Sequence, residues 1–309
     1  MRSVDDFLVP RSAGKETLEI IRDLAGIGPR FPGSGGQEKT QRYIESVLES
    51  STKKIFRQPF NISLFGREVS CTNIIASFEN EHAEGHDEKH EEEKRRPILI
   101  GTHYDTRLRA DREESLELKA RPIEGANDGG SGTAILLWLS GILRSLHLER
   151  EILLVFFDAE DVGDIDGNDF SMGAAFFASE PVPAAPEEVI ILDMVGGKNM
   201  VLDIDAHLGA HMESFNLTRE IWRIGMEKGF RPFTESGNGN IKYIICDHIP
   251  FLLKNITSTL LIDLNYPEWH TQRDTIDNIS EESLWIIEEV LVSYLLRYSS
   301  EYSQYSPLR

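Results

Sequence analysis

Runs of apolar, β-branched residues alternate with helical patterns along most of this chain, and that alternation limits the folds open to it. Seven runs are expected to form strands: 54–60, 71–78, 96–103, 151–158, 189–193, 200–204 and 258–264. Several of them are apolar at nearly every position, which is typical of strands covered by helices on both faces. The sequence therefore predicts an α/β fold, a three-layer sandwich in which helices flank a twisted, mostly parallel (mixed) central sheet.

Helices are expected between and after these strands, at residues 37–50, 134–146, 211–228 and 283–296. Ser34 and Gln37 form a capping box at the start of the first one. Gly229 is a stop signal for the third, and Ser280 with two glutamates suits the start of the last.

The alternation of strands and helices predicts one domain over residues 1–309. One segment differs from the rest: residues 79–96 are rich in charge and carry histidines 82, 86 and 90 at four-residue spacing. That spacing could bind a metal ion on one helix face. Because no apolar residues surround these histidines, we expect a solvated loop insertion between two strands instead.

The balance of charge excludes one class of partner. The chain has 32 basic and 52 acidic residues, a net charge of −20, and such a field repels the phosphates of nucleic acids. The longest apolar run, 134–143, is too short to span a bilayer, so no membrane partner is expected. Acids in the first ten residues do not suit an export signal, and two cysteines suit a reducing compartment. The expected location is the cytoplasm; the sequence does not indicate an oligomeric state.

Residues of the kinds that bind metal ions follow several of the expected strands. In open α/β sheets, ligands bind beyond the carboxyl ends of the strands, so these side chains are expected to converge on one edge. The candidates are His103 and Asp105 after one strand, Glu160 and Asp161 after the next, Asp193 at the end of a third, His270 after a fourth, and Asp128 in the glycine-rich turn 125–132.

Histidine and carboxylate ligands without cysteine suit a catalytic zinc ion with an open coordination position. Asp105 could fix the tautomer of the His103 imidazole, and Glu160 beside Asp161 offers a free carboxylate for general-base catalysis. Each residue alone has a plainer explanation as a turn former, a helix cap or a satisfied polar group. Their conjunction favours a zinc site with an adjacent base.

Five motifs, GTHYDT, GANDGGSG, FFDAED, ILDMVG and PEWHT, occur in that order along the chain. Together they resemble the zinc aminopeptidases and their relatives, the glutaminyl-peptide cyclotransferases, over nearly the whole chain. The stretches DHIPFLLKN and YPEWHTQRDTIDNIS are more similar to the cyclotransferases. This metallopeptidase resemblance implies a mixed sheet flanked by helices, in agreement with the pattern of strands.

The resemblance to the cyclotransferases implies that Asp128, Asp161 and His270 hold one zinc ion. It implies that Glu160 carries a proton from the α-amine to the leaving amide nitrogen, and that Asp193 supports it by hydrogen bonding. Trp269 would line the substrate pocket, and Asp247 in the DHIPF motif is a further candidate for substrate binding.

The resemblance to the aminopeptidases implies a second zinc position. His103 and Asp193 would hold that ion, with Asp128 bridging the two metals, and Glu160 would deprotonate the attacking water. One zinc ion is therefore expected, with a second position available.

Three positions depart from the family pattern. Asp161 stands where a glutamate is usual, and Cys246 stands where the cyclotransferases have an acid. The loop VGDIDGND (162–169) replaces an aromatic wall with the carboxylates of Asp164, Asp166 and Asp169, which we expect to be solvated. The resemblance also implies a cis peptide bond after Asp128.

Three functions are consistent with these residues. The favoured one is conversion of the N-terminal glutamine of a peptide to pyroglutamate with release of ammonia. The first alternative is hydrolysis of the N-terminal peptide bond by a zinc aminopeptidase, and the second is a non-catalytic zinc-binding relative. In either enzyme the substrate would be a peptide or small amide with a free N-terminus.

Overall fold

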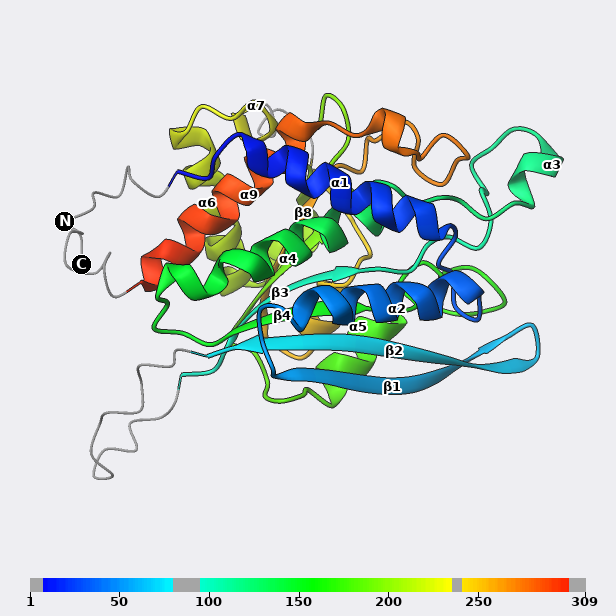
Figure 1. Cartoon of the computed structure of the whole chain (residues 1–309), viewed down its shortest axis with the longest axis horizontal. Helices are drawn as coiled ribbons and strands as arrows, with labels where there is room; N and C mark the ends of the chain where they lie inside the picture. The colour runs from blue at the N-terminus through cyan, green and yellow to red at the C-terminus, as the bar shows by residue number, and fades with distance from the viewer. Residues whose placement is uncertain (1–7, 80–94, 235–240, 300–309) are drawn as a thin grey trace.

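A six-stranded mixed sheet runs through the computed structural model, which describes residues 8–79, 95–234 and 241–299 (Figure 1). The strands, in their order across the sheet, are β1 (Ile55–Leu64), β2 (Arg67–Phe78), β4 (Ile152–Phe157), β3 (Ile98–His103), β5 (Glu188–Asp193) and β8 (Thr257–Ile262). Strands β4, β3, β5 and β8 are parallel. The β1–β2 hairpin is antiparallel and joins the edge of β4 in antiparallel register.

The parallel strands are apolar because both faces of the sheet are covered. Every residue of β3 and of β4 is buried. Side chains of a strand point alternately to opposite faces: Ile98 and Ile100 belong to the apolar core on one face, and Leu99 belongs to the core on the other. The predicted α/β class is confirmed.

Helices form a layer on each face of the sheet (Figure 1). One layer contains α1 (Ser12–Ile27), α2 (Gly35–Leu48), α4 (Gly130–Ile142), α6 (Met212–Glu227) and α9 (Glu281–Leu295). The other contains α5 (Met172–Ser179) and α8 (Ile249–Leu253). The short helices α3 (Leu116–Lys119) and α7 (Arg231–Thr234) and a small parallel sheet of β6 (Ile204–Asp205) and β7 (Ile241–Lys242) complete these elements.

The residues expected from the sequence to begin or end helices do so in the structure. Ser34 Oγ accepts a hydrogen bond from the backbone N–H of Gln37 at 3.0 Å and starts α2. Ser280 Oγ accepts one from the N–H of Ser283 at 3.2 Å and starts α9. Gly229, with φ of +72°, follows the end of α6 in the left-handed conformation that glycine tolerates.

The expected strand at 200–204 is wrong. Met200 and Leu202 are buried, but only Ile204 of this segment belongs to a strand, and Asp203 makes a single bridge to Ile262. The apolar residues here reflect burial of an irregular segment against the core. Helices α1 and α5 were not among those expected from the sequence.

The charged insertion expected at 79–96 lies, for residues 80–94, outside the described residues. The organisation of the chain as one domain remains a prediction. Among the described residues, no helix has both the length and the apolar character needed to cross a membrane.

Two glycines of α4 differ in the space around them, and this difference shows how closely the helix approaches the sheet. A Cβ at Gly132 would overlap the side chain of Thr102, 2.8 Å from its Cβ, and would lie 3.0 Å from the carbonyl oxygen of Leu192. We expect Gly132→Ala to lower the free energy of unfolding by about 1–3 kcal/mol through overpacking. Gly141→Ala, on the same helix with no atom within 4 Å of the new Cβ, should instead raise it by about 0.5–1 kcal/mol. Chemical denaturation of both variants would measure this difference, and equal stabilities would contradict it.

Candidate active site and metal centre

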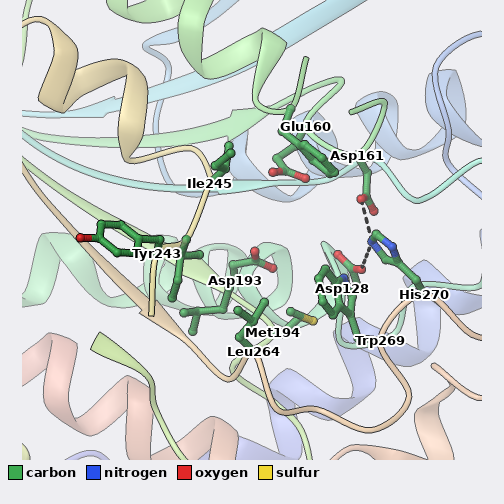
Figure 2. A pocket seen from close by; sticks show the side chains of 13 residues that line it. Asp128, Glu160, Asp161, Asp193, Met194, Tyr243, Ile245, Leu264, Trp269 and His270 are labelled. Atoms are coloured by element: carbon green, nitrogen blue, oxygen red, sulfur yellow. Dashed lines mark hydrogen bonds and ion pairs between the residues drawn. The ribbon is translucent and has the colours of Figure 1, made fainter. Parts of the chain in front are cut away.

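The candidate ligands meet at the carboxyl edge of the parallel strands (Figure 2). Their side chains are almost fully buried, with exposures of only 1–7%. They come from the last residue of β3 (His103), the turn after β4 (Glu160 and Asp161), the last residue of β5 (Asp193), the turn before α4 (Asp128) and the loop after β8 (His270).

Three of these residues, Asp128, Asp161 and His270, surround one point (Figure 2). His270 Nε2 lies 3.1 Å from Asp161 Oδ1 and 3.5 Å from Asp128 Oδ2. Asp161 Oδ2 is buried and has no hydrogen-bond partner among the described residues. A divalent cation would satisfy that oxygen and offset the repulsion between two buried carboxylates, so this donor set fits zinc.

A second group shares Asp128. His103 Nε2 lies 3.3 Å from Asp128 Oδ1 and 3.4 Å from Asp193 Oδ1, and the candidate donor atoms of all three residues lie within 4.8 Å of one another. Asp128 therefore presents one carboxylate oxygen to each histidine. This is the arrangement that the aminopeptidase resemblance implies for a bridging carboxylate.

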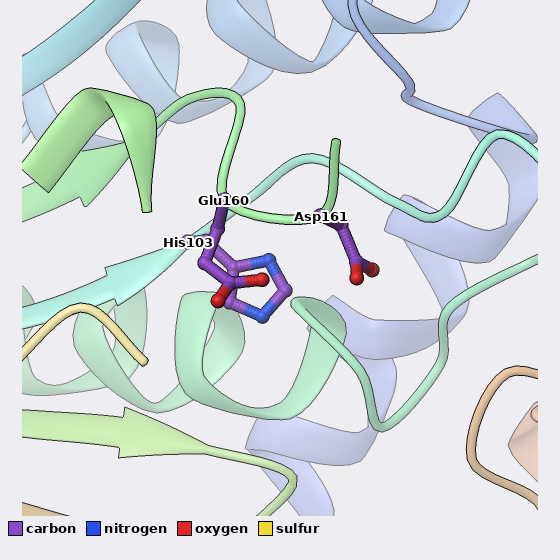
Figure 3. A group of neighbouring side chains, drawn as sticks. All are labelled: His103, Glu160 and Asp161. Atoms are coloured by element: carbon purple, nitrogen blue, oxygen red, sulfur yellow. The ribbon is translucent and has the colours of Figure 1, made fainter. Parts of the chain in front are cut away.

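Glu160 lies beside both groups. Figure 3 shows its carboxylate next to the His103 imidazole, with Asp161 on the same turn. One oxygen of Glu160 is 3.4 Å from the hydroxyl of Ser171. The carboxylate lines the pocket together with the metal-binding candidates, which puts it within reach of a bound substrate.

Asp105 is fully buried and lies outside the residues that line the pocket. Its carboxylate accepts hydrogen bonds from the backbone N–H groups of Glu160 and Asp161, at 3.0 and 3.1 Å. Its backbone carbonyl oxygen is 3.2 Å from His103 Nδ1, which leaves Nε2 directed at the metal position. Asp105 therefore positions the candidate catalytic residues and does not itself face the pocket.

The two candidate substrate-binding residues differ in position. Trp269 is half-buried and lines the pocket, and its ring centroid lies 4.7 Å from that of His270. Asp247 is fully buried and is not part of the pocket wall. Its contact with substrate remains a prediction, and in its ionised form its charge would raise the pKa of Glu160.

Burial and mutual repulsion shift the pKa values of the acids. Burial raises the pKa of Asp128 to about 6, and the Asp161 carboxylate adds to the rise. Burial also raises the pKa of Glu160 well above its usual value; His103 opposes this shift, whereas Asp161 and Asp247 reinforce it. Burial likewise raises the pKa of Asp247 to about 8. A carboxyl with a raised pKa can both accept and return a proton near neutral pH.

The histidines respond to the same charges in the opposite sense. Burial alone would lower the pKa of His270, but the Asp161 carboxylate and hydrogen bonds to Asp111 and Asp161 raise it to about 10. Burial also opposes protonation of His103, yet hydrogen bonds to Asp105, Asp128 and Asp193 raise its pKa well above the usual value.

Two acids that hold the site together were not identified from the sequence. Asp274 accepts hydrogen bonds from the backbone N–H groups of Asn127 and Asp128, at 2.9 and 3.1 Å, and so fixes the turn that carries Asp128. Asp111 lies 3.1 Å from His270 Nδ1. Asp274 follows His270 by four residues, which was the available signal, whereas nothing in the polar segment around Asp111 distinguished it.

The pocket above the metal position has a volume of about 230 Å³. That is below the roughly 300–1,000 Å³ typical of sites for drug-sized ligands, and it suits a single amino-acid residue. Its apolar walls are formed by Phe170, Met194, Tyr243, Ile244, Ile245, Ile262, Leu264 and Trp269.

The loop after Asp161 was expected to supply no aromatic residue to the pocket wall, and the structure differs from this expectation. Asp164, Asp166 and Asp169 are exposed and do not line the pocket, as expected for solvated loop acids. Phe170, directly after them, does line it.

The expected cis bond after Asp128 is wrong: among the described residues, only the Val182–Pro183 bond is cis.

The raised histidine pKa values predict that zinc binding depends on pH. A ligating imidazole must be neutral, and His270, with a pKa of about 10, is protonated at pH 7 unless a metal displaces the proton. Protein stripped of metal should therefore bind zinc more tightly as the pH rises from 6 to 8, by about tenfold per pH unit for each proton displaced. Competition with a chromophoric chelator at three pH values would measure this, and an affinity independent of pH would contradict it.

The chain is similar in sequence to an aminopeptidase and to a glutaminyl-peptide cyclotransferase. The chain is 29% identical to aminopeptidase YwaD from Bacillus subtilis (strain 168) over 167 residues, which cover 52% of this chain and 34% of that protein. It is 24% identical to the glutaminyl-peptide cyclotransferase of Bos taurus over 313 residues, which cover 87% of this chain and 78% of that one. The chain thus spans about a third of the length of the aminopeptidase it matches.

Solved structures share the fold. The glutaminyl cyclase of Fimbriiglobus ruber superimposes with a TM-score of 0.81 at 25% identity, over 96% of this chain and 99% of that one. A Zn-dependent exopeptidase from Parabacteroides distasonis superimposes with a TM-score of 0.80 at 25% identity, over 93% and 99% of the two chains. The sequence model of peptidase family M28 matches residues 82–295. The resemblance read from the motifs is confirmed, and the chain belongs to peptidase family M28.

Proposed function

We propose that this protein is a zinc-dependent glutaminyl-peptide cyclotransferase, which converts an N-terminal glutamine to pyroglutamate and releases ammonia. The observation that carries the proposal is the buried Glu160 carboxyl beside the group Asp128, Asp161 and His270, at the end of a pocket sized for one residue. The similarity to the bovine cyclotransferase over 87% of the chain supports the same function.

Asp128, Asp161 and His270 are the residues proposed to hold the zinc ion. When bound there, zinc would polarise the γ-carbonyl group of glutamine and stabilise the negative charge that develops on its oxygen. Among the described residues, the acid-rich pocket lining contains no lysine or arginine, which favours a substrate that brings its own positive charge. A free N-terminal amine does so.

Glu160 is proposed to transfer the proton. The neutral α-amine of glutamine attacks the carbonyl carbon of its own side-chain amide and loses a proton to the Glu160 carboxylate; the same proton then passes to the amide nitrogen as its bond to that carbon breaks and ammonia departs. One group must therefore act first as a base and then as an acid. The raised pKa of Glu160 suits this double role near neutral pH. Asp193, which also lines the pocket, would support the network by hydrogen bonding.

The apolar walls favour cyclisation over hydrolysis. Attack by the substrate's own amine is intramolecular and needs no second reactant. Hydrolysis requires a water molecule at the reacting carbon. The walls formed by Phe170, Trp269 and the neighbouring side chains are apolar, so they offer few groups that would hold such a water molecule in place.

Hydrolysis of an N-terminal peptide bond is the second candidate, and the position of His103 favours it. His103 lies 3.3 and 3.4 Å from carboxylate oxygens of Asp128 and Asp193, so these three could hold a second zinc ion. Glu160 would then take a proton from the attacking water. A non-catalytic role is the least supported candidate, because the ligand side chains and Glu160 all converge on the pocket.

The broader expectations belong to this proposal. The substrate would be a peptide or small amide with a free N-terminus, acted on in the cytoplasm by a single-domain protein without nucleic acid or membrane partners. The net charge of −20 supports the exclusion of nucleic acid.

Metal content measured together with two substrates separates the enzymes. Protein purified without added metal would be analysed for zinc per chain and assayed with a glutaminyl peptide and with an aminoacyl anilide. One zinc ion and ammonia release from the glutaminyl peptide would support the cyclotransferase. Two zinc ions and cleavage of the anilide would make the protein an aminopeptidase, and zinc binding without turnover on either substrate would favour the non-catalytic role.

Replacement of the proposed proton carrier should separate catalysis from metal binding. Glu160→Gln keeps the shape and loses the titratable group, so we expect unchanged zinc content and a kcat lower by about 10²–10⁴-fold. Zinc analysis and ammonia release measure the two properties on one sample. Normal turnover by this variant would remove Glu160 from the mechanism.

Removal of either of two proposed zinc ligands should remove the metal. Asp128→Ala and His270→Ala each delete one of three proposed zinc ligands, and we expect dialysed samples of both to hold much less than one zinc ion per chain. Asp164→Ala, which removes an exposed acid of the neighbouring loop, is the matched control and should retain zinc. Full zinc content in both ligand variants would disprove this site.

A further inference from the structure

The segment 107–113 packs against the loop that carries His270 and against the turn that carries Asp161. Its contacts with the His270 loop involve successive residues. The backbone N–H of Arg112 donates to the carbonyl oxygen of His270 at 3.2 Å, and Glu113 Oε1 accepts from the backbone N–H of Gln272 at 2.8 Å. These bonds fix the backbone at the carbonyl group of the histidine and two residues after it.

The His270 backbone needs such support. Its φ is +57°, in the left-handed region that a residue with a Cβ rarely adopts. A conformation of this kind persists where the surroundings hold it. The side chain of Arg112 adds a further contact, because its guanidinium carbon lies 3.7 Å from the ring centroid of Trp269, the residue before His270.

Asp111 acts on the imidazole itself. Its Oδ1 lies 3.1 Å from His270 Nδ1, on the opposite side of the ring from Nε2, which faces Asp161 and Asp128. When the imidazole is neutral and Nδ1 carries the proton, the Nδ1–H group donates to Asp111. The lone pair of Nε2 is then free to bind a metal ion. Asp111 does not line the pocket, so it has no direct contact with substrate.

Arg107 joins Asp111 to the other side of the site. Its Nη2 donates to Asp111 Oδ2 at 2.5 Å, and its Nε donates to the same oxygen at 3.1 Å. Its Nη1 donates to the backbone carbonyl oxygens of Asp161 and Gly163, at 2.8 and 2.7 Å. Only 3% of the arginine is exposed. One buried guanidinium thus holds the partner of one candidate ligand and the backbone of another.

We infer that Arg107 and Asp111 form a clamp that positions His270 and Asp161 and thereby sets the metal affinity of the group Asp128, Asp161 and His270. Both are positioning residues, since neither touches the pocket. The inference rests on the proposed zinc site and adds to it a pair of residues that fix the positions of two zinc ligands relative to one another.

The test is the zinc dissociation constant of variants at Asp111, measured by competition with a chromophoric chelator. Asp111→Ala removes the acceptor for Nδ1–H and should weaken zinc binding by about 10–100-fold, the usual effect of losing a hydrogen-bond partner of a metal ligand. Asp111→Asn keeps a carbonyl oxygen at the same place and should lose less. Glu114→Ala, which removes an equal charge from an exposed position on the same segment, is the control and should bind zinc as the wild type does.

Arg107→Leu tests whether the two residues act together. We expect it to weaken zinc binding as well, and the double variant with Asp111→Ala to lose less than the sum of the two single effects, because each residue acts through the other. Full additivity would mean that the residues act independently and would overturn the clamp.

A second readout separates positioning from general stability. If the clamp acts through the metal, activity of Asp111→Ala should recover when zinc is raised above its weakened dissociation constant, with KM for the peptide unchanged. Activity that stays low at saturating zinc would overturn the inference, as would zinc binding by Asp111→Ala within twofold of the wild type. Should the alanine variant fail to fold, as judged by circular dichroism, Arg107→Leu decides by the same criteria. Failure of the wild type to bind zinc would instead refute the proposed site.

Discussion

Repulsion among buried carboxylates is the constraint on which the rest of this site depends. Asp105, Asp128, Glu160, Asp161 and Asp193 lie together at one edge of the sheet, each less than one-tenth exposed. Buried anions are tolerated only with hydrogen bonds, opposite charges or a metal ion. The backbone supplies part of the compensation, the two histidines supply another part, and a cation between the carboxylates would supply the remainder.

The compensation also explains why the loops around the site are so firmly held. The Asp105 carboxylate accepts from the N–H groups of Glu160 and Asp161. In the same way, Asp274 accepts from the N–H groups of the turn that contains Asp128. Both of these acids are stabilised by backbone donors, and in return each fixes the turn that carries a candidate ligand. Charge burial and precise placement are therefore two results of the same contacts.

Much of the fold and of the site could be read from the sequence because both depend on the strands. Strands covered on both faces are continuously apolar, and parallel strands bring their carboxyl ends to one edge. His103, Asp161 and Asp193 could therefore be placed together without a structure. The same logic failed at 200–204, where an irregular segment is apolar because Met200 and Leu202 are buried.

The partners of the ligands could not be predicted, because they come from loops. Asp111 and Arg107 lie in a segment with no periodic pattern, so the sequence does not show that this segment approaches His270. Phe170 contributes an aromatic wall, but its position is not part of any of the motifs. Loop residues acquire their roles from tertiary contacts that a single sequence does not encode locally. The residues that the sequence did not identify, Arg107, Asp111 and Phe170, thus all lie in loops, whereas the loop residues Asp128 and His270 could be identified from the motifs that contain them.

The choice between one and two metal ions depends on Asp193, and its environment permits both. Asp193 Oδ1 is 3.4 Å from His103 Nε2, and Oδ2 is 3.4 Å from the sulfur of Cys246. Burial and the Asp193 charge raise the pKa of Cys246 well above its usual value, so the thiol keeps its proton and donates it to Oδ2. Oδ1 then remains available either to a hydrogen bond or to a metal beside His103. Since the candidate donor atoms of each group already lie within 4.8 Å of one another, a one-metal site and a two-metal site would draw on the same set of side chains.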